Sequence, residues 1–155
     1  MQADAYKKGL TPPSVFDCEW HSEEFMHIAE VQTQREQEAA EKGLPFAIYD
    51  TDAFATQLWH ERYMGFHSAE LEQFVQHLPK RSLYILPSIE DVPFEQDGLR
   101  DGEQIRHQMH QAFRDALIAM APNVPFIEVK GSVSERVEQS ISAILQLKHP
   151  FESME

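Results

Sequence analysis

Short apolar runs alternate with longer amphipathic stretches along this sequence, and the alternation predicts its secondary structure. Three runs are typical of strands: FAIY at 46–49, SLYIL at 82–86 and PFIEV at 125–129. The first two are apolar on both faces, as in parallel strands that helices cover on both sides. Strands that alternate with helices favour a parallel α/β sheet.

The stretches between and after these runs have apolar residues at helical spacing. The first predicted helix extends from Ser22, its expected N-cap, to about Lys42, and Gly43 follows as the expected end signal. The second half of this helix is polar almost all round and is expected to be solvated. Four more helices are predicted by four stripes: Phe54, Leu58, Trp59 and Tyr63; Leu71, Phe74, Val75 and Leu78; Ile105, Met109, Phe113, Ala116, Leu117 and Met120; Val133, Val137, Ile141, Ile144 and Leu145.

Length and composition indicate one domain. The chain has 155 residues, of which 42% are hydrophobic, enough to bury a core without metals or disulfides. We predict an irregular segment at 1–20, an α/β domain at 21–149 and a short tail at 150–155.

Charge and cysteine content narrow the function classes. The formal net charge of -13 opposes nonspecific binding to nucleic acid or to an anionic membrane. The single cysteine, Cys18, excludes an internal disulfide and is typical of a reducing compartment. No apolar run approaches the roughly 20 residues of a membrane span, and no secretory signal begins the sequence. These features predict a cytoplasmic protein.

Two acids follow the first predicted strand directly, at Asp50 and Asp52. Ligands of a parallel sheet bind beyond the carboxyl ends of its strands, so acids there could hold Mg²⁺ through water or accept a proton from a substrate hydroxyl. The alternative is that Asp52 caps a helix beginning at Ala53 while Asp50 is a solvated turn residue. The local pattern leaves these two interpretations balanced.

A long acidic loop follows the second predicted strand, and Arg100 and Arg106 lie near its end. Arginine binds phosphate oxygens in a fork, so both could belong to a lid that closes over a nucleotide. Without family information we favour the alternative, in which they are surface arginines that neutralise nearby acids: Glu95, Asp97, Asp101 and Glu103.

A metal site on the long helix is a weaker hypothesis. His107 and His110 have a spacing that can place two ligands together. No third ligand is anchored nearby in the sequence, and we favour a polar helix face.

Two segments together carry a family resemblance: FAIYDTDAFATQLWHERYMG at 46–65 and ILPSIEDVPFEQDGLRDG at 85–102. They resemble the nicotinamide riboside kinase domain of bacterial NadR-type proteins and the related P-loop ATPase domains. The resemblance extends from about residue 24 to 145. The matching residues are Asp50, Thr51, Asp52, Thr56, Gln57, Pro93, Phe94, Asp97, Gly98, Leu99 and Arg100.

The resemblance implies a three-layer, parallel-sheet, P-loop kinase-like fold. It also implies phosphoryl transfer from ATP, with Mg²⁺, to a riboside hydroxyl in NAD biosynthesis, so the expected partners are a nucleotide and a small riboside. Carried over by position, Asp50 would lie near Mg²⁺, Asp52 would bind the substrate hydroxyl or act as base, and Arg100 and Arg106 would contact the phosphates. The expected substrate contacts are Asp52, Thr56, Gln57 and Phe94.

One departure from the family pattern is severe. The sequence contains no Gly-x-x-x-x-Gly-Lys-Ser/Thr, the motif whose amides and lysine hold phosphates. The resemblance implies that the strand carrying this motif lies between 46–49 and 82–86, and residues 1–20 offer no apolar run to replace it. We therefore expect an incomplete fold whose unpaired sheet edges allow self-association.

Two explanations of this departure remain open. The chain is either a truncated form of a longer kinase, inactive without the missing motif, or a degenerate noncatalytic module that binds a nucleotide or another protein. We favour the truncated form because the acids and the lid segment are intact.

Overall fold

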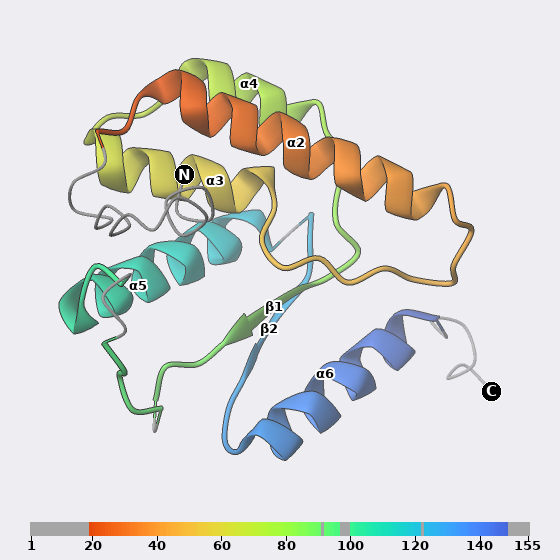
Figure 1. The fold of residues 1–155 in the computed structure, drawn as a ribbon. Coiled ribbons are helices and arrows are strands. Elements are labelled where there is room, and N and C mark those ends of the chain that lie inside the picture. Colours follow the sequence, from red (N-terminus) through yellow and green to blue (C-terminus); the bar gives the residue numbers. More distant parts are fainter. Residues whose placement is uncertain (1–18, 91, 97–99, 122, 149–155) are drawn as a thin grey trace, which may run out of the picture. The chain divides into compact units, whose positions relative to one another are not determined.

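The computed structural model describes residues 19–90, 92–96, 100–121 and 123–148. Contacts divide the described chain into two compact units, residues 19–79 and residues 80–148. We call them the helical unit and the strand unit; Figure 1 shows their elements in chain order.

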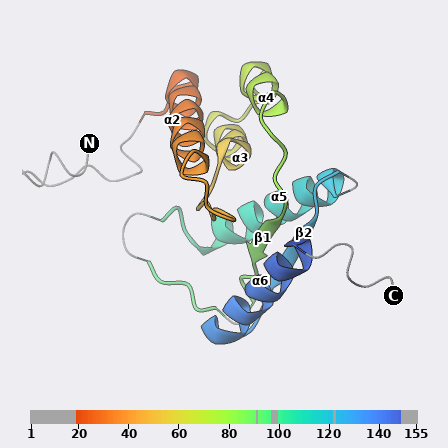
Figure 2. The same ribbon diagram turned by 90° about the vertical axis from the view of Figure 1, so that its right-hand side faces the viewer.

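The helical unit contains three packed helices, α2 (Ser22–Ala40), α3 (Ala53–Met64) and α4 (Ala69–Gln76). Figure 2 shows the three lying side by side. Each contributes to one core, in which Phe25 and Ala29 of α2, Ala53 of α3 and Leu71 of α4 are at most 3% exposed. The predicted stripe of α4 and two residues of the α3 stripe, Trp59 and Tyr63, belong to this core or pack against it. The residues packed against it are Trp20, Met26, Trp59, Tyr63, Met64, Phe74, Val75 and Leu78.

The ends of α2 differ from the prediction by a residue or two. Its N-cap is His21, not Ser22, and the His21 N–H donates to Glu24 Oε2 at 3.0 Å. Beyond the helix, Gly43 adopts a φ of 65°, and its N–H donates to the carbonyl of Ala40 at 3.1 Å. Most residues from 34 to 42 are exposed, so the predicted solvated half of this helix is confirmed.

The strand unit is a small parallel α/β arrangement of β1 (Tyr84–Pro87), α5 (Glu103–Met120), β2 (Phe126–Val129) and α6 (Val133–Lys148). The two strands pair in parallel, with Tyr84 beside Phe126 and Pro87 beside Val129. The helices α5 and α6 lie on opposite sides of the strands (Figures 1 and 2). The second and third predicted strands and their parallel pairing are therefore confirmed.

The first predicted strand is wrong. Residues 46–49 form no strand, and Phe46 and Ile48 are 51% and 71% exposed. The hydroxyl of Tyr49 donates to the carbonyl of Glu36 at 3.3 Å, which attaches this segment to α2. An apolar run becomes a strand only where a neighbour pairs its backbone groups, and no described segment supplies that neighbour.

The last predicted stripe forms α6 as expected, but of its five residues only Ile144 is half-buried. Val133, Val137, Ile141 and Leu145 are between 50% and 80% exposed.

In the part of the chain that the structure describes, no helix has both the length and the apolar character needed to cross a membrane.

Candidate functional site

The acids that the sequence singles out lie in the turn before α3. Asp52 is 5% exposed, and its Oδ1 accepts a hydrogen bond from the N–H of Ala55 at 3.0 Å. The capping interpretation of Asp52 is therefore confirmed. Asp50 is exposed in the turn, as the same interpretation predicts, but the strand expected to precede it is absent.

The backbone between the two acids has an uncommon conformation. Thr51 has a φ of 64°, in the left-handed region that β-branched residues rarely adopt. A glutamine of α2 holds this turn from outside: Gln32 Nε2 donates to Thr51 Oγ1 at 2.9 Å, and Gln32 Oε1 accepts from Thr56 Oγ1 at 2.7 Å. Backbone strain of this kind persists only where surrounding contacts fix it, and it occurs often at functional sites.

Gln32 was not among the predicted site residues, although its position carried a signal. It is a polar residue on the α2 face that also carries Phe25 and Ala29. Of the two predicted substrate residues on α3, Thr56 is buried in this network, and Gln57 is half-buried beside it.

The predicted lid arginine Arg106 is engaged by its own loop. Its Nη1 and Nη2 both donate to the carbonyl of Val92 at 3.0 Å, and its guanidinium carbon lies 5.5 Å from the centre of the Phe94 ring. Its contact with an acid is longer, at 3.8 Å from Nη2 to Glu103 Oε1. The Nε atom is buried and has no hydrogen-bond partner among the described residues. Arg106 thus holds the loop after β1 against α5.

The other predicted lid residue, Arg100, is exposed, and its carbonyl accepts a hydrogen bond from Gln96 Nε2 at 3.1 Å. Three residues of the family motif, Asp97, Gly98 and Leu99, lie outside the described residues, as does Cys18. The two acids belong to the helical unit and the two arginines to the strand unit.

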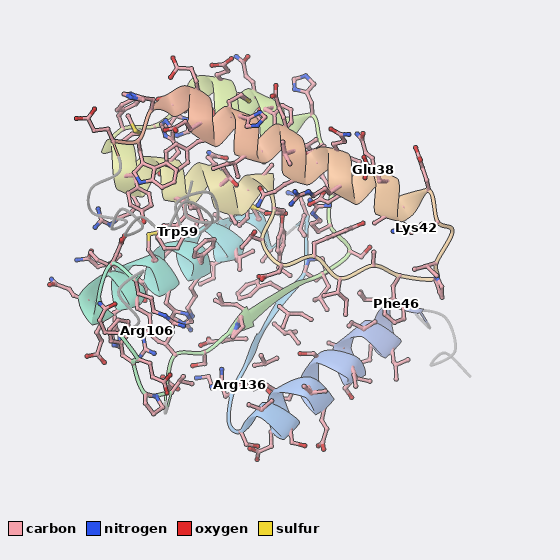
Figure 3. All side chains as sticks on the ribbon, viewed as in Figure 1. Glu38, Lys42, Phe46, Trp59, Arg106 and Arg136 are labelled. Carbon is pink, nitrogen blue, oxygen red and sulfur yellow. The ribbon has the colours of Figure 1, made fainter. Side chains whose placement is uncertain are left out.

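A third arginine, Arg136, which sequence reasoning missed, joins the segments that follow the two strands (Figure 3). Arg136 donates through Nη1 to the carbonyl of Ser88 at 2.7 Å, through Nη2 to that of Glu90 at 3.5 Å, and through Nε to that of Gly131 at 2.7 Å. Beside it, Lys130 Nζ donates to Glu90 Oε2 at 2.9 Å. That hydrogen bond lowers the pKa of Glu90 and raises the pKa of Lys130. We call Arg136, Lys130 and Glu90 the strand-end clamp.

The turn from β2 into α6 requires glycine. Gly131 has a φ of 90°, and a Cβ there would lie 2.6 Å from Glu135 Oε2. That carboxylate oxygen accepts hydrogen bonds from Ser132 N and Oγ at 2.7 and 2.6 Å, which lower the pKa of Glu135. At the start of α6, the N–H of Ser132 is therefore already bonded to a side chain of the same helix.

The paired histidines of α5 lie on a polar helix face. His110 Nε2 is 3.4 Å from Glu128 Oε1, and Arg114 Nε is 3.6 Å from Glu128 Oε2. His107 is exposed. Within the described segments, no group of three potential ligands could hold a metal ion.

The described residues do not by themselves fit Mg²⁺ and ATP. Asp50 offers an exposed carboxylate that suits Mg²⁺ bound through water. However, nothing in the sequence supplies the glycine-rich amides and lysine that hold phosphates, and the Arg106 fork is bonded to Val92. We therefore assign no reaction step to these residues alone.

Comparison with known proteins identifies a family over most of the chain. The family model described as an AAA domain matches residues 6–136. No curated protein and no solved structure matches the chain. An AAA domain has a P-loop NTPase-like α/β fold, and the two parallel strands of the strand unit are consistent with an incomplete version of it.

Proposed function

This chain belongs to the AAA domain family, and we propose that it provides the substrate-side part of a nucleotide-dependent phosphotransferase. The proposed reaction transfers a phosphoryl group from ATP, with Mg²⁺, to a hydroxyl of nicotinamide riboside. Family membership supports use of a nucleotide and Mg²⁺. The resemblance of residues 46–65 and 85–102 to nicotinamide riboside kinase domains supports the acceptor.

The observation that carries this proposal is the turn at residues 50–52. Gln32, which accepts a hydrogen bond from Thr56, holds Thr51 in a strained conformation, and the Asp50 carboxylate beside it is exposed. A turn that only connected two helices would have no need of a β-branched residue at positive φ. In the proposed enzyme, Asp50 lies near Mg²⁺ and Asp52 orients the substrate hydroxyl.

We further propose that the phosphate-binding segment is supplied from outside these 155 residues. The apolar segment at 44–48 is exposed and forms no strand, and among the described strands β1 pairs only with β2. Both features are what a sheet lacking a strand would leave. In this proposal the 155-residue chain alone is inactive, and the cytoplasm, where ATP is abundant, is its expected location.

Two measurements test the proposal. The first is the intact mass of the protein in its source cell, which we expect to exceed the 17.9 kDa of this chain. The second is phosphorylation of nicotinamide riboside by that natural polypeptide. Asp52→Asn should abolish transfer with little loss of stability, since asparagine also caps helices. Glu41→Gln, which changes an exposed acid at the end of α2, should leave it unchanged.

A noncatalytic module is the second candidate, and one observation favours it. The side chains of Asp52, Thr56 and Arg106 each have a structural partner within the chain. A natural mass of 17.9 kDa, together with no binding of Mg²⁺-ATP by calorimetry, would favour this module over the enzyme.

A further inference from the structure

The hydroxyl of Thr51 is a polar group of the 50–52 turn to which neither the cap of α3 nor the proposed reaction gives a role. Thr51 is exposed, and its Oγ1 accepts a hydrogen bond from Gln32 Nε2 at 2.9 Å. A threonine hydroxyl accepts hydrogen bonds and also donates one. No described residue accepts the proton of this hydroxyl, so its O–H group is free to donate to a bound molecule.

The backbone of the turn suggests that the threonine side chain is used. Thr51 has a φ of 64°, and glycine or asparagine would adopt this conformation with less strain than a β-branched residue. Strained residues of this kind occur often where a ligand is bound, because the surrounding contacts hold a side chain in a functional position. The strain therefore points to a function for the hydroxyl itself.

Gln32 fixes the orientation of that hydroxyl. Gln32 Oε1 accepts a hydrogen bond from Thr56 Oγ1 at 2.7 Å, and the NH₂ group of the same amide therefore faces Thr51. Because Gln32 Nε2 donates to Thr51 Oγ1, the Thr51 O–H bond is directed away from the amide. All of these contacts lie within the helical unit, so they do not depend on a segment from outside the chain.

The chemistry of the turn lacks a side-chain donor other than Thr51. Asp50 precedes Thr51 and has an exposed carboxylate, and Asp52 follows it and caps α3 with its carboxylate. An ionised carboxylate only accepts hydrogen bonds. An oxygen atom of a substrate beside these acids therefore needs a donor that neither acid supplies, and the Thr51 hydroxyl is such a donor.

We propose that Thr51 is a substrate-binding residue and that Gln32 is its positioning residue. The Thr51 hydroxyl donates a hydrogen bond to an oxygen of the bound riboside or of the phosphoryl group that is transferred to it. This role rests on the proposed function, because it requires that Asp50 and Asp52 face the substrate. The kinetic constants distinguish the two oxygens. Loss of a bond to the riboside raises KM, whereas loss of a bond that the phosphoryl group makes only during transfer lowers kcat.

Steady-state kinetics of the natural polypeptide with nicotinamide riboside and Mg²⁺-ATP test the proposal. Thr51→Val keeps the branched shape of the side chain but removes the hydroxyl, and it should lower kcat/KM at least about threefold, as expected for one lost hydrogen bond. Thr51→Ser restores the hydroxyl and should keep kcat/KM within about twofold of the unaltered polypeptide. Because Thr51 is exposed, both variants should retain the circular dichroism spectrum.

Gln32→Glu tests the positioning role. A glutamate at this position accepts hydrogen bonds from both threonine hydroxyls, so the turn stays attached to α2 but the Thr51 proton is no longer free. We expect a loss of kcat/KM similar to that of Thr51→Val. In the Thr51→Val background, Gln32→Glu should cause little further loss, since the hydroxyl is already absent. The matched control is Gln37→Glu, which adds the same charge to an exposed position of α2 and should leave the kinetics unchanged.

The outcomes separate this role from the proposed function. If the unaltered natural polypeptide does not phosphorylate nicotinamide riboside, the proposed function is overturned and this role with it. If that polypeptide is active, unchanged kcat/KM in Thr51→Val overturns the role of Thr51 alone, and so does an equal loss in Thr51→Val and Thr51→Ser. A lower urea midpoint of Thr51→Val with unchanged kinetics would mean that the hydroxyl bonds another part of the polypeptide, which also overturns the role. Full additivity of Gln32→Glu and Thr51→Val overturns the positioning role of Gln32.

Discussion

The helical unit and the strand unit use their apolar residues in different ways. In the helical unit, Phe25, Ala29, Ala53 and Leu71 close a core from all three helices. In the strand unit, α5 buries Met109 and Leu117, but the apolar residues Val133, Val137, Ile141 and Leu145 of α6 are at least half exposed, and among the described strands β1 pairs only with β2. Helices satisfy their own backbone hydrogen bonds, whereas strands depend on neighbours. An α/β fold that lacks a strand can therefore keep a closed helical part while its sheet stays open.

We expect the largest loss of stability from a leucine-to-alanine substitution in the helical unit, and a much smaller loss from the same substitution in the strand unit. Leu71→Ala removes a side chain that is 1% exposed and should destabilise the helical unit by about 2–5 kcal/mol, the usual range for a buried leucine. Leu145→Ala, at a position 51% exposed, should change stability by less than about 1 kcal/mol.

Hydrogen exchange measured by mass spectrometry, at a concentration where the chain is monomeric, distinguishes the units in these variants. Faster exchange in α2, α3 and α4 of Leu71→Ala, with the strand unit unchanged, would support the comparison. Equal effects of Leu71→Ala and Leu145→Ala would contradict it, because they would mean that α6 is packed in solution.

The hydrogen bonds that Arg136 donates to backbone carbonyls should contribute more stability than the exposed ion pairs of the strand unit. Arg136→Met keeps much of the side-chain length but leaves the carbonyls of Ser88 and Gly131 without their donor. Hydrogen bonds to charged groups contribute about 1.5–3 kcal/mol, so we expect a loss in that range and faster exchange after β1. Arg114→Met, at an arginine 48% exposed and 3.6 Å from Glu128, should cost less than about 1 kcal/mol. Similar losses in both variants would show that Arg136 is an ordinary surface residue.

Most helices and both paired strands could be predicted from sequence, since their signals are local. The stripe of α3 repeats at the helical period, and residues 84–87 and 126–129 lie in short runs suited to buried strands. The run at 46–49 carries the same local signal, yet it is exposed. Strand formation depends on a pairing partner, and no property of four residues reveals whether that partner is present.

The site was predictable only where side chains act on nearby backbone. Asp52 precedes a helix, and its capping role follows from that position. The clamp was missed because Arg136 bonds carbonyls up to 48 residues away, and any residue type can supply a carbonyl. Gln32 was missed as a site residue because an amide on an otherwise apolar helix face does not indicate its partners.

Two substitutions of Asp52, the N-cap of α3, should distinguish loss of the capping hydrogen bond from loss of the negative charge. We expect a smaller change in stability than in the variants above. Asp52→Ala should lower the stability of the helical unit by about 1 kcal/mol, whereas Asp52→Asn should lower it far less, since asparagine also accepts the Ala55 N–H. Urea denaturation measures both. An equal loss in the two variants would mean that the negative charge of Asp52, rather than the cap, stabilises the unit.

The smallest effect is a dependence on pH that should be confined to the helical unit. His60 is fully buried, and its Nε2 lies 2.9 Å from Ser22 Oγ. Burial lowers its pKa below the usual 6.5, against a hydrogen bond with the backbone of Phe66 and the attraction of Glu61. Below pH 6.5 the unfolded chain therefore binds a proton that the folded unit rejects, and stability falls as the pH falls toward the lowered pKa. His60→Gln should remove this loss.

His67 should act in the opposite direction at the surface of the same unit. Its ring nitrogens lie 2.7 Å from Glu61 Oε1 and 3.2 Å from Glu72 Oε2, and these hydrogen bonds raise its pKa above 6.5. Its contribution is present below pH 6.5 and is lost as the pH rises through the raised pKa, so His67→Gln should flatten that decline. Among the described residues of the strand unit, the pKa values of Glu90 and Glu135 are lowered from 4.5 and that of Lys130 is raised from 10.5, so these shifts lie outside the range between about pH 5 and 8. Within that range, the protection factors from hydrogen exchange, corrected for the intrinsic exchange rate at each pH, should therefore change in α2, α3 and α4 but not around Arg136. An equal response of the strand unit would contradict this assignment.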